Sequence, residues 1–348
     1  MMKIHKKNNK VASITDVANA AKTSISTVSR YFNNPSMVAP AAAHRIARAA
    51  EELSYVRNRA AASTRSKRSG TVGIVIPTLE SSIFAEMTES FSNRLLDHDM
   101  TMLLTPCLYD RDIEARIVRS FTEHRVDSVV LVGGDHNDEV MELLDERQVP
   151  ALLVWNHIAG HRLNSIGVDN RRIGRMAAQH LVDLGHRDVA VISGLADVND
   201  RAAGRREGAL EILASYGLMP KPEWILQTPY DLDFTKSLVS NLLLNSKPRP
   251  TAIIGGNDII AMAAIWAAQS HGLSVPQDIS VIGIGDFKGS AEMVPALTTI
   301  RIPARRIGRM AADRIAELII GQTSGGGVKV ENQEVEPEFK FRHSTATC

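Results

Sequence analysis

Short apolar runs alternate with amphipathic stretches through most of the chain, and this rhythm restricts the fold more than any other feature. The first runs lie at 71–77 (TVGIVIP), 100–104, 126–134 and 149–155, with helical spacing between them at 84–97, 113–125 and 139–148. A run without polar alternation is typical of a strand that is buried on both faces. Strands alternating with helices predict right-handed crossovers and a doubly wound α/β sheet.

A second series of the same kind begins near Arg171. Its runs lie at 188–194, 224–227, 251–257 and 279–286, its helices at 173–184, 203–216, 234–244 and 259–271, and a closing strand at 335–342. Two series of similar size predict two similar lobes that face each other across a cleft. The octapeptide RRIGRMAA occurs at both 171–178 and 305–312, which hints that these helices begin where the chain passes between lobes.

Residues 14–30 (ITDVANAAKTSISTVSR) have a different pattern, with two short amphipathic helices separated by a polar break at 22–24. Ser13 or Thr15 is a suitable N-cap for the first helix and Ser24 for the second. The second helix spaces Ile25, Val28 and Phe32 on one face, and a third helix follows at 40–53. Such a pair predicts a helix-turn-helix, although two small core helices of any globular domain give the same pattern.

The charge distribution decides between these interpretations. Residues 1–70 contain thirteen Lys or Arg and three acidic residues, a balance of +10, whereas the whole chain is +1 and residues 71–348 therefore carry −9. A basic small domain on an acidic body is typical of a protein that binds nucleic acid. The sequence therefore favours DNA binding by the N-terminal helices.

Motifs for enzymatic chemistry, cofactors and metals are missing from the sequence. It contains no P-loop, no G-x-G-x-x-G after the first strand, no H-E-x-x-H and no G-x-S-x-G. His157 and His161 fall in a predicted loop, so we expect no metal site there. We predict no enzyme activity and no cofactor. Two cysteines, no signal peptide and no membrane-spanning apolar run predict a reduced, cytoplasmic protein.

Polar and aromatic residues gather near the predicted carboxyl ends of the strands, where two-lobed α/β proteins bind ligands. We take the following as candidate effector-binding residues: Ser82, Phe84, Asp135, Trp155, Asn156, Asn199, Arg205, Tyr230, Asn257 and Asp286. Asn, Asp and Arg side chains pair with hydroxyl and carboxylate groups, and aromatic rings cover flat faces. Strand-end loops are polar in any α/β protein, so only the whole set argues for a small polar ligand.

Several motifs in the same order resemble the lactose/galactose/purine repressor (LacI/GalR) family. They are ITDVANAAKTSISTVSRYFN, VDNRRIGRMAAQHLVDLGHRDVAVISG, GGNDIIAMAA, VPQDISVIGIGD and PALTTIRIP. The resemblance implies a cytoplasmic transcriptional regulator, usually a repressor, that binds a palindromic DNA operator as a homodimer. It also implies a core like the periplasmic sugar-binding proteins, in which an effector between the lobes changes their relative angle.

The resemblance also implies which residues contact DNA and the effector. At the start of the second helix Ile25 and Ser26 fall on base-reading positions, and Arg30 can pair with a guanine. Ile25 offers only apolar contact, or faces the core of the head instead. The full predicted DNA-binding set is Thr15, Ser24, Ile25, Ser26, Thr27, Arg30, Asn33, Asn58, Arg59 and Thr64. In the cleft, Arg205 is the strongest match, because GRREG fits the R-x-x-G of the family.

The sequence also departs from the family pattern. Lys22 replaces the usual Gly of the inter-helix turn, and Ala39 replaces the Ser that caps the third helix. The hinge lacks its proline, and Thr64 stands where relatives wedge a leucine into the minor groove, so the chain lacks the apolar wedge that the family uses to kink the operator centre. The cleft carboxylate is shifted by one position to Asp286, which suggests a different ligand geometry.

The sequence therefore predicts an α/β protein with a three-helix helix-turn-helix head and a two-lobed, doubly wound core. The head is 1–57, the hinge 58–70 and the core 71–348, with lobe one at about 71–168 and 303–328 and lobe two at about 169–302 and 329–343. We predict a dimeric repressor controlled by a sugar or sugar acid. A cytosolic small-molecule sensor without DNA regulation is the main alternative, and an enzyme is a third.

Overall fold

The computed structural model describes residues 12–56, 68–323 and 329–348. Contacts divide the chain into two compact units, Met1–Ser69 and Gly70–Cys348, and each unit is described by itself. We call them the head and the core. Among the described residues, every helix is too short or too polar to cross a membrane.

In its described residues the head has three helices, α1 (Ile14–Ala20), α2 (Ile25–Asn33) and α3 (Pro40–Glu52), with a 3-10 turn at Pro35–Met37. Ser13 caps α1 through a reciprocal capping box with Asp16, and the Ser24 hydroxyl accepts a hydrogen bond from the Thr27 amide at 3.1 Å. These bonds satisfy amide groups that have no partner within the helix. The helices enclose a small apolar core: Val17, Ala18, Ala21, Val28, Val38, Ile46 and Ala49.

The turn between α1 and α2 keeps its expected shape without glycine. Lys22 has a φ of 52°, in the left-handed region where a side chain costs about 1–2 kcal/mol. The Arg45 Nε atom on α3 donates to the Ala21 carbonyl at 3.1 Å, which holds the end of α1 in place. At the start of α3 Ala39 provides no side-chain cap, and Pro40 occupies the first turn, where no amide hydrogen is needed.

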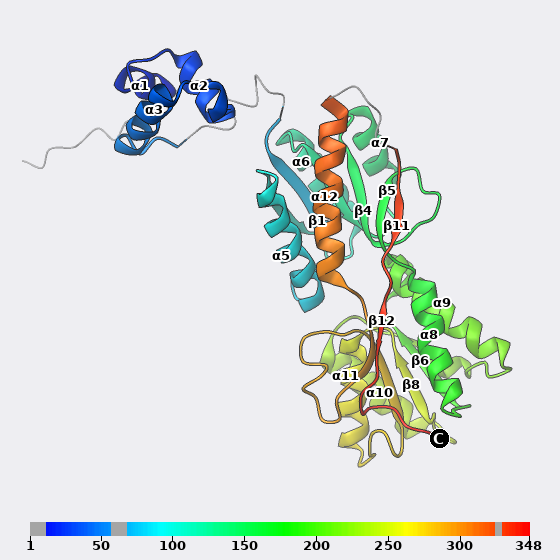
Figure 1. Ribbon diagram of the computed structural model, residues 1–348. Helices are drawn as coiled ribbons and strands as arrows, with labels where there is room; N and C mark the ends of the chain where they lie inside the picture. Colours follow the sequence, from blue (N-terminus) through cyan, green and yellow to red (C-terminus); the bar gives the residue numbers. More distant parts are fainter. Residues whose placement is uncertain (1–11, 57–67, 324–328) are drawn as a thin grey trace, which may run out of the picture. The chain divides into compact units, whose positions relative to one another are not determined.

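The core contains two six-stranded sheets in its described residues (Figure 1), each with helices on both faces. The first sheet has the order β11-β5-β4-β3-β1-β2 and the second β12-β10-β9-β8-β6-β7. The first consists of β1 (Thr71–Ile76), β2 (Thr101–Pro106), β3 (Ser128–Val132), β4 (Ala151–Asn156), β5 (Asn164–Val168) and β11 (Asn332–Glu334). The second consists of β6 (Val189–Ser193), β7 (Ile225–Gln227), β8 (Ala252–Gly255), β9 (Ser280–Gly285), β10 (Thr298–Arg301) and β12 (Glu338–Lys340).

Alternating side chains along the strands bury both faces of each sheet. In β1, Ile74 packs with α5 (Ser82–Asp97) and α12 (Ala304–Thr323), whereas Val75 points to α6 (Arg111–Glu123) and α7 (Asp138–Glu146). In β6, Val191 and Ile192 divide in the same way between two helix pairs. The pairs are α8 (Asn170–Asp183) with α9 (Asp200–Ser215), and α10 (Leu232–Asn245) with α11 (Asp258–Ser270). The predicted doubly wound, two-lobed α/β core is confirmed.

The repeated octapeptide lies where the chain changes lobe. The copy at 171–178 lies in α8, the first helix after the strands of lobe one, and the copy at 305–312 lies in α12, which returns from β10 to lobe one. A Cβ atom on Gly174 would lie 2.0 Å from the Arg205 carbonyl oxygen on α9, and one on Gly308 would lie 2.3 Å from the Met87 carbonyl oxygen on α5. The repeat therefore places a glycine where two helices pack backbone to backbone.

The closing segment differs from its prediction. The sequence predicts one strand at 335–342 and places 329–343 in lobe two. Instead, β11 pairs in parallel with β5 in lobe one, and of these two strands only β12 joins the second sheet. Both strands have three residues and lie at sheet edges, so they lack the continuous apolar run of a buried strand. Strands β5 and β10 were also missed, because Asn164, Ser165, Thr298 and Thr299 interrupt their apolar pattern although all four are buried.

Candidate functional site

The start of α2 presents an exposed polar surface in the head. Ser24, Ile25, Ser26 and Arg30 are exposed, and Thr27 is half-buried. Ile25 is 41% exposed, so its side chain points away from the head's core, which Val28 enters instead. The Ser24 hydroxyl lies 2.7 Å from that of Ser26 and 2.8 Å from that of Thr27, which ties these side chains together at the helix N-terminus.

The other residues predicted to contact DNA are spread over the head and beyond it. Thr15 is exposed in the first turn of α1, and Ser13 is the N-cap in its place. Asn33 ends α2. Asn58, Arg59 and Thr64 lie outside the described residues.

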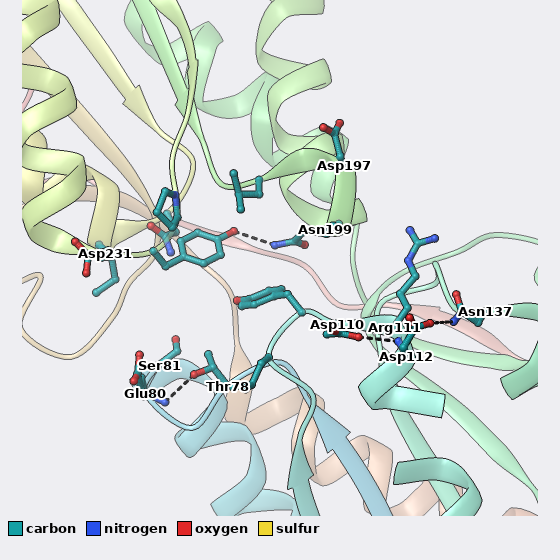
Figure 2. A pocket seen from close by; sticks show the side chains of 18 residues that line it. Thr78, Glu80, Ser81, Asp110, Arg111, Asp112, Asn137, Asp197, Asn199 and Asp231 are labelled. Atoms are coloured by element: carbon teal, nitrogen blue, oxygen red, sulfur yellow. Dashed lines mark hydrogen bonds between the residues drawn. The ribbon is translucent and has the colours of Figure 1, made fainter. Parts of the chain in front are cut away.

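A cavity of about 930 Å³ opens between the two lobes of the core (Figure 2), at the carboxyl ends of the central strands. Lobe one contributes Thr78, Glu80, Ser81, Leu108, Tyr109, Asp110, Arg111, Asp112 and Asn137, and lobe two contributes Leu195, Asp197, Val198, Asn199, Pro229, Tyr230, Asp231, Asn257 and Ile259. A volume of this size is ample for a small-molecule ligand. Of the predicted effector residues, Asn199, Tyr230 and Asn257 line this cavity.

A second space of about 30 Å³, room for about one water, is lined by three of the seven remaining predicted residues. Phe84, Trp155 and Arg205 line it, and the rings of Phe84 and Trp155 lie 4.9 Å apart. Ser81, Tyr109, Asn199, Tyr230 and Asn257 line both spaces. We call the larger space the outer chamber and the smaller one the inner chamber, and these five shared residues form the boundary between them.

Arg205 is a buried cation in the wall of the inner chamber. It is 8% exposed, its Nε atom donates to the Arg201 carbonyl at 3.1 Å, and burial lowers the pKa of its guanidinium. Among the described residues, no carboxylate lies within ion-pair distance of it. A buried guanidinium without a counter-charge is costly, so this group favours a ligand oxygen as its partner.

Helix caps fix the polar residues at the boundary. The side-chain Oδ1 atom of Asn199 accepts from the Ala202 amide at the start of α9, and its Nδ2 atom donates to the Tyr230 hydroxyl at 2.9 Å. The side-chain Oδ1 atom of Asn257 accepts from the Ile260 amide at the start of α11 at 3.0 Å. Capping therefore orients both side chains before any ligand arrives, and no acceptor for the Asn257 Nδ2 atom is found among the described residues.

Four predicted residues are used elsewhere in the core. Asp135 forms an ion pair with Arg111, and the Asn156 amide donates to Asp200 at 2.6 Å. Asp286 is bound by Arg301 and Arg342, each at 2.6 Å, which leaves this carboxylate already paired. Ser82 begins α5 beside Ser81, and it is Ser81 that reaches the cavity.

The structure also places Tyr109 in the cleft, although the sequence did not indicate it as an effector-binding residue. Its ring lies 5.6 Å from that of Tyr230 in the other lobe, and burial raises the pKa of its phenol. Leu108 and Tyr109 have φ angles of 56° and 61°, two consecutive left-handed residues without glycine. The sequence held one signal for these two residues: they lie between the apolar run of β2 and Asp110, the N-cap of α6.

Hydrogen bonds at the start of α9 tie the lobes together beside the cavity. The Asp200 carboxylate accepts from the Gly134 amide at 2.8 Å and from Asn156, and Arg201 donates to the Val132 carbonyl at 3.1 Å. These partners lie at the ends of β3 and β4 in lobe one, whereas Asp200 and Arg201 belong to lobe two. A change in the angle between the lobes would have to rearrange these bonds.

Comparison with known proteins agrees with this architecture. Residues 13–58 match the family described as bacterial regulatory proteins, lacI family, and residues 178–345 match the periplasmic binding protein-like domain. The chain is 30% identical over 338 residues to the HTH-type transcriptional repressor PurR of Edwardsiella ictaluri, with 97% of both chains covered. It is 31% identical over 339 residues to PurR of Serratia proteamaculans, again with 97% of both covered.

Solved structures of the same family resemble the whole chain. The lac repressor dimer bound to operator and the anti-inducer ONPF superposes with a TM-score of 0.85 at 25% identity, covering 97% of this chain and 100% of that one. A LacI-family regulator from Silicibacter pomeroyi has the same fold, with a TM-score of 0.83 at 23% identity over 96% of this chain and 99% of that one. The chain therefore belongs to the lacI family of bacterial regulatory proteins: it is a ligand-responsive, DNA-binding transcriptional regulator and not an enzyme.

Proposed function

We propose that this regulator is a cytoplasmic repressor that binds a palindromic operator as a homodimer, with α2 of each head in the major groove. The observation that carries this proposal is the exposed N-terminal turn of α2 on a head of net charge +10 over residues 1–70. Helix-turn-helix dimers read two half-sites about one helical turn apart. The lac repressor of similar fold was solved as a dimer on its operator, which supports the same arrangement here.

The exposed side chains of α2 divide into two roles. Ser26 and Ile25 stand at the helix start, where side chains reach base edges, and Ile25 is suited to the methyl group of a thymine. Ser24 and Thr27 hold hydroxyls that bind phosphate, and Arg30 can reach a guanine or a phosphate. Thr15 on α1, Asn33 and the hinge residues Asn58 and Arg59 complete the proposed set.

The hinge leads to a further expectation about the DNA. Thr64 offers a hydroxyl and one methyl group where relatives offer leucine, so it is a poor wedge between base pairs. We therefore expect an operator that stays closer to straight than those of relatives that insert leucine.

The effector is a small polar molecule that binds between the lobes, and a sugar or sugar acid is the class we propose. Arg205 supports a ligand with acceptor oxygens, because it is buried and no carboxylate of the described residues lies within ion-pair distance of it. To reach Arg205 such a ligand must separate Tyr109 from Tyr230, since the inner chamber is no larger than a water. Opening or closing the lobes around it would shift their angle, which couples effector binding to DNA binding.

The DNA part of this proposal is tested by selecting bound sequences from a random library and footprinting the winner. We expect a palindromic footprint, a dimer by sedimentation, and an affinity that falls steeply as salt rises. A footprint without two-fold symmetry, or a monomer on DNA, would contradict the dimer.

The effector part is tested by a thermal-shift screen of sugars and sugar acids on the full chain, followed by operator titrations with each hit. A ligand that binds only the folded state raises the melting temperature. We expect Arg205→Met to abolish both the thermal shift and the change in operator affinity while leaving DNA binding without effector intact. An unchanged response in the variant would remove Arg205 from the site.

A further inference from the structure

The outer chamber is lined by more exposed apolar surface than a simple sugar requires. Leu108 is 65% exposed, and Leu195 and Val198 are also exposed. Tyr109 and Tyr230 add two aromatic rings on the inner side. Exposed apolar side chains that converge on one cavity indicate a ligand with an apolar body.

The charges around the same chamber are strongly one-sided. Five carboxylates line it, and they come from both lobes: Glu80, Asp110, Asp112, Asp197 and Asp231. Arg111 is the one cation among the lining residues in the described part of the chain, and it already forms an ion pair with Asp135. The rim is therefore negative.

Two of the five carboxylates have no structural task in the described part of the chain. Asp110 and Asp231 cap α6 and α10, and Asp112 accepts a hydrogen bond from Asn137. Glu80 and Asp197 accept no hydrogen bond and form no ion pair among the described residues. Figure 2 shows them on opposite sides of the view, with Glu80 in lobe one and Asp197 in lobe two. Helix capping accounts for Asp110 and Asp231 and a hydrogen bond for Asp112, whereas neither accounts for Glu80 and Asp197.

Buried donors on the inner side point to a ligand independently of the acidic rim. Arg205 and Asn257 are each more than nine-tenths buried, and both line the inner chamber. The guanidinium of Arg205 has no carboxylate partner, and the Asn257 Nδ2 atom has no acceptor among the described residues. Both groups are therefore able to donate hydrogen bonds to an acceptor oxygen of a bound ligand.

From these observations we infer that the effector is an organic cation: an amine on an apolar or aromatic body, with an acceptor oxygen at the opposite end. The amine lies between Glu80 and Asp197, the apolar body lies against Leu108, Tyr109 and Tyr230, and the oxygen faces Arg205 and Asn257. This inference rests on the proposed effector site between the lobes, and it replaces an acidic effector with a cationic one. Among sugars it selects an amino sugar over a sugar acid.

The same charges explain how a cation would act on the lobes. Glu80, Asp110 and Asp112 belong to lobe one, and Asp197 and Asp231 belong to lobe two, so closing the cleft brings like charges together. Repulsion between them opposes closure when the chamber is empty. A cation between the lobes would cancel this repulsion and favour the closed arrangement, because it binds that arrangement more tightly.

Calorimetric titration of the full chain without DNA tests this inference with three matched probes. They are 5-methoxytryptamine, 5-methoxytryptophol and 5-methoxyindole-3-acetate, which share a flat ring and an ether oxygen but differ in charge from positive to neutral to negative. We expect the amine to bind about tenfold more tightly than the alcohol, and the acid more weakly than both. Raising the salt concentration should weaken binding of the amine but not binding of the alcohol.

A double variant locates the charge recognition. Glu80→Gln with Asp197→Asn should lower the affinity for the amine to the affinity for the alcohol. The affinity for the alcohol should not change. The control is Glu142→Gln with Glu223→Gln, one exposed carboxylate in each lobe away from the chamber, which should preserve the preference.

The opposite results would overturn the inference. Tightest binding of the acid, equal binding of all three probes, no binding of any, or an unchanged preference in the Glu80/Asp197 variant each excludes a cation-selective chamber. Operator binding by the same preparation is measured separately. A failure of the probes therefore leaves the DNA-binding proposal standing, and a failure to bind DNA does not depend on the probes.

Discussion

The head and the core organise their functional groups in different ways. In the head, Ser24, Ile25, Ser26 and Arg30 belong to one helix and its cap, so helical spacing alone sets their relative positions. In the core, the chambers collect side chains from loops that follow separate strands, from Thr78 after β1 to Asn257 after β8. A local site survives small shifts between elements, whereas an assembled site depends on every packing contact that positions its strands.

The two units also differ in how much core supports their function. Within the described part of the head the buried apolar core has seven residues, whereas the core unit shares large clusters across two sheets. Small domains bury a smaller fraction of their surface and are closer to unfolding. The same loss of packing should therefore have unequal consequences in the two units.

Truncation of one buried side chain in each unit should give the largest effect. Ile46 in the head and Leu153 in β4 are both fully buried, so either change to alanine should cost about 2–5 kcal/mol. Ile46→Ala should unfold the head and abolish operator binding, while Leu153→Ala lowers the melting temperature of a core that stays folded. Calorimetry with operator titration checks both, and a head that still binds DNA after Ile46→Ala would contradict the difference.

Removal of the exposed guanidinium of α2 should give the next largest effect. Arg30→Ala should weaken operator binding by about 1–3 kcal/mol, because it removes a base or phosphate contact. Effector binding to the core should not change, since Arg30 belongs to the other unit. Fluorescence anisotropy with labelled operator measures the first quantity and calorimetry the second. Equal loss of both would indicate that the variant has unfolded the whole chain.

Replacement of the strained turn residue should stabilise the head modestly. Lys22→Gly relieves a left-handed backbone at a cost in unfolded-state entropy, so we expect a gain of about 0.5–1 kcal/mol. Arg125→Gly, at a φ of 56° in the core, is the matched control and should raise only the stability of the core. Denaturant unfolding followed separately for each unit distinguishes them. A destabilised Lys22→Gly head would show that Lys22 makes a contact worth more than its strain.

Mild acid should distinguish the units by a smaller amount. Burial lowers the pKa of His180 and of His186 below 6.5, so unfolding of the core takes up protons between the folded values and 6.5. Their contribution to stability is complete above 6.5 and is lost as the pH falls through the folded values. The urea concentration at the unfolding midpoint of the core should therefore decrease as the pH is lowered from about 7.5 to about 5.5.

The control for this pH effect removes both buried imidazoles. A variant with His180→Gln and His186→Gln should show a flatter dependence of the core midpoint on pH over the same interval. The urea midpoint of the head, measured in the same samples, is the internal reference. A head that loses stability in parallel with the core would assign the pH dependence to other groups.

The sequence by itself determined what depends on near neighbours along the chain. The capping serines, the helix pair of the head and most buried strands follow from spacing and side-chain chemistry within a few residues. The two places where the chain passes between the lobes could be predicted because the repeated octapeptide marks both of them. Short edge strands such as β11 could not, because their pairing and not their own composition makes them strands.

Tertiary structure alone decided which strand-end residues meet in the cleft. Asp286 carries a carboxylate at the right strand end, yet Arg301 and Arg342 pair with it, so pairing partners far along the chain decide its role. Tyr109 shows the reverse case, since only the packing of lobe against lobe places its ring beside Tyr230. Helical spacing positions side chains over a few ångströms, whereas a cleft between lobes is positioned by contacts between distant residues, such as Asn199 with Tyr230, 31 positions apart, and Gly134 with Asp200, 66 positions apart. No local pattern records these contacts.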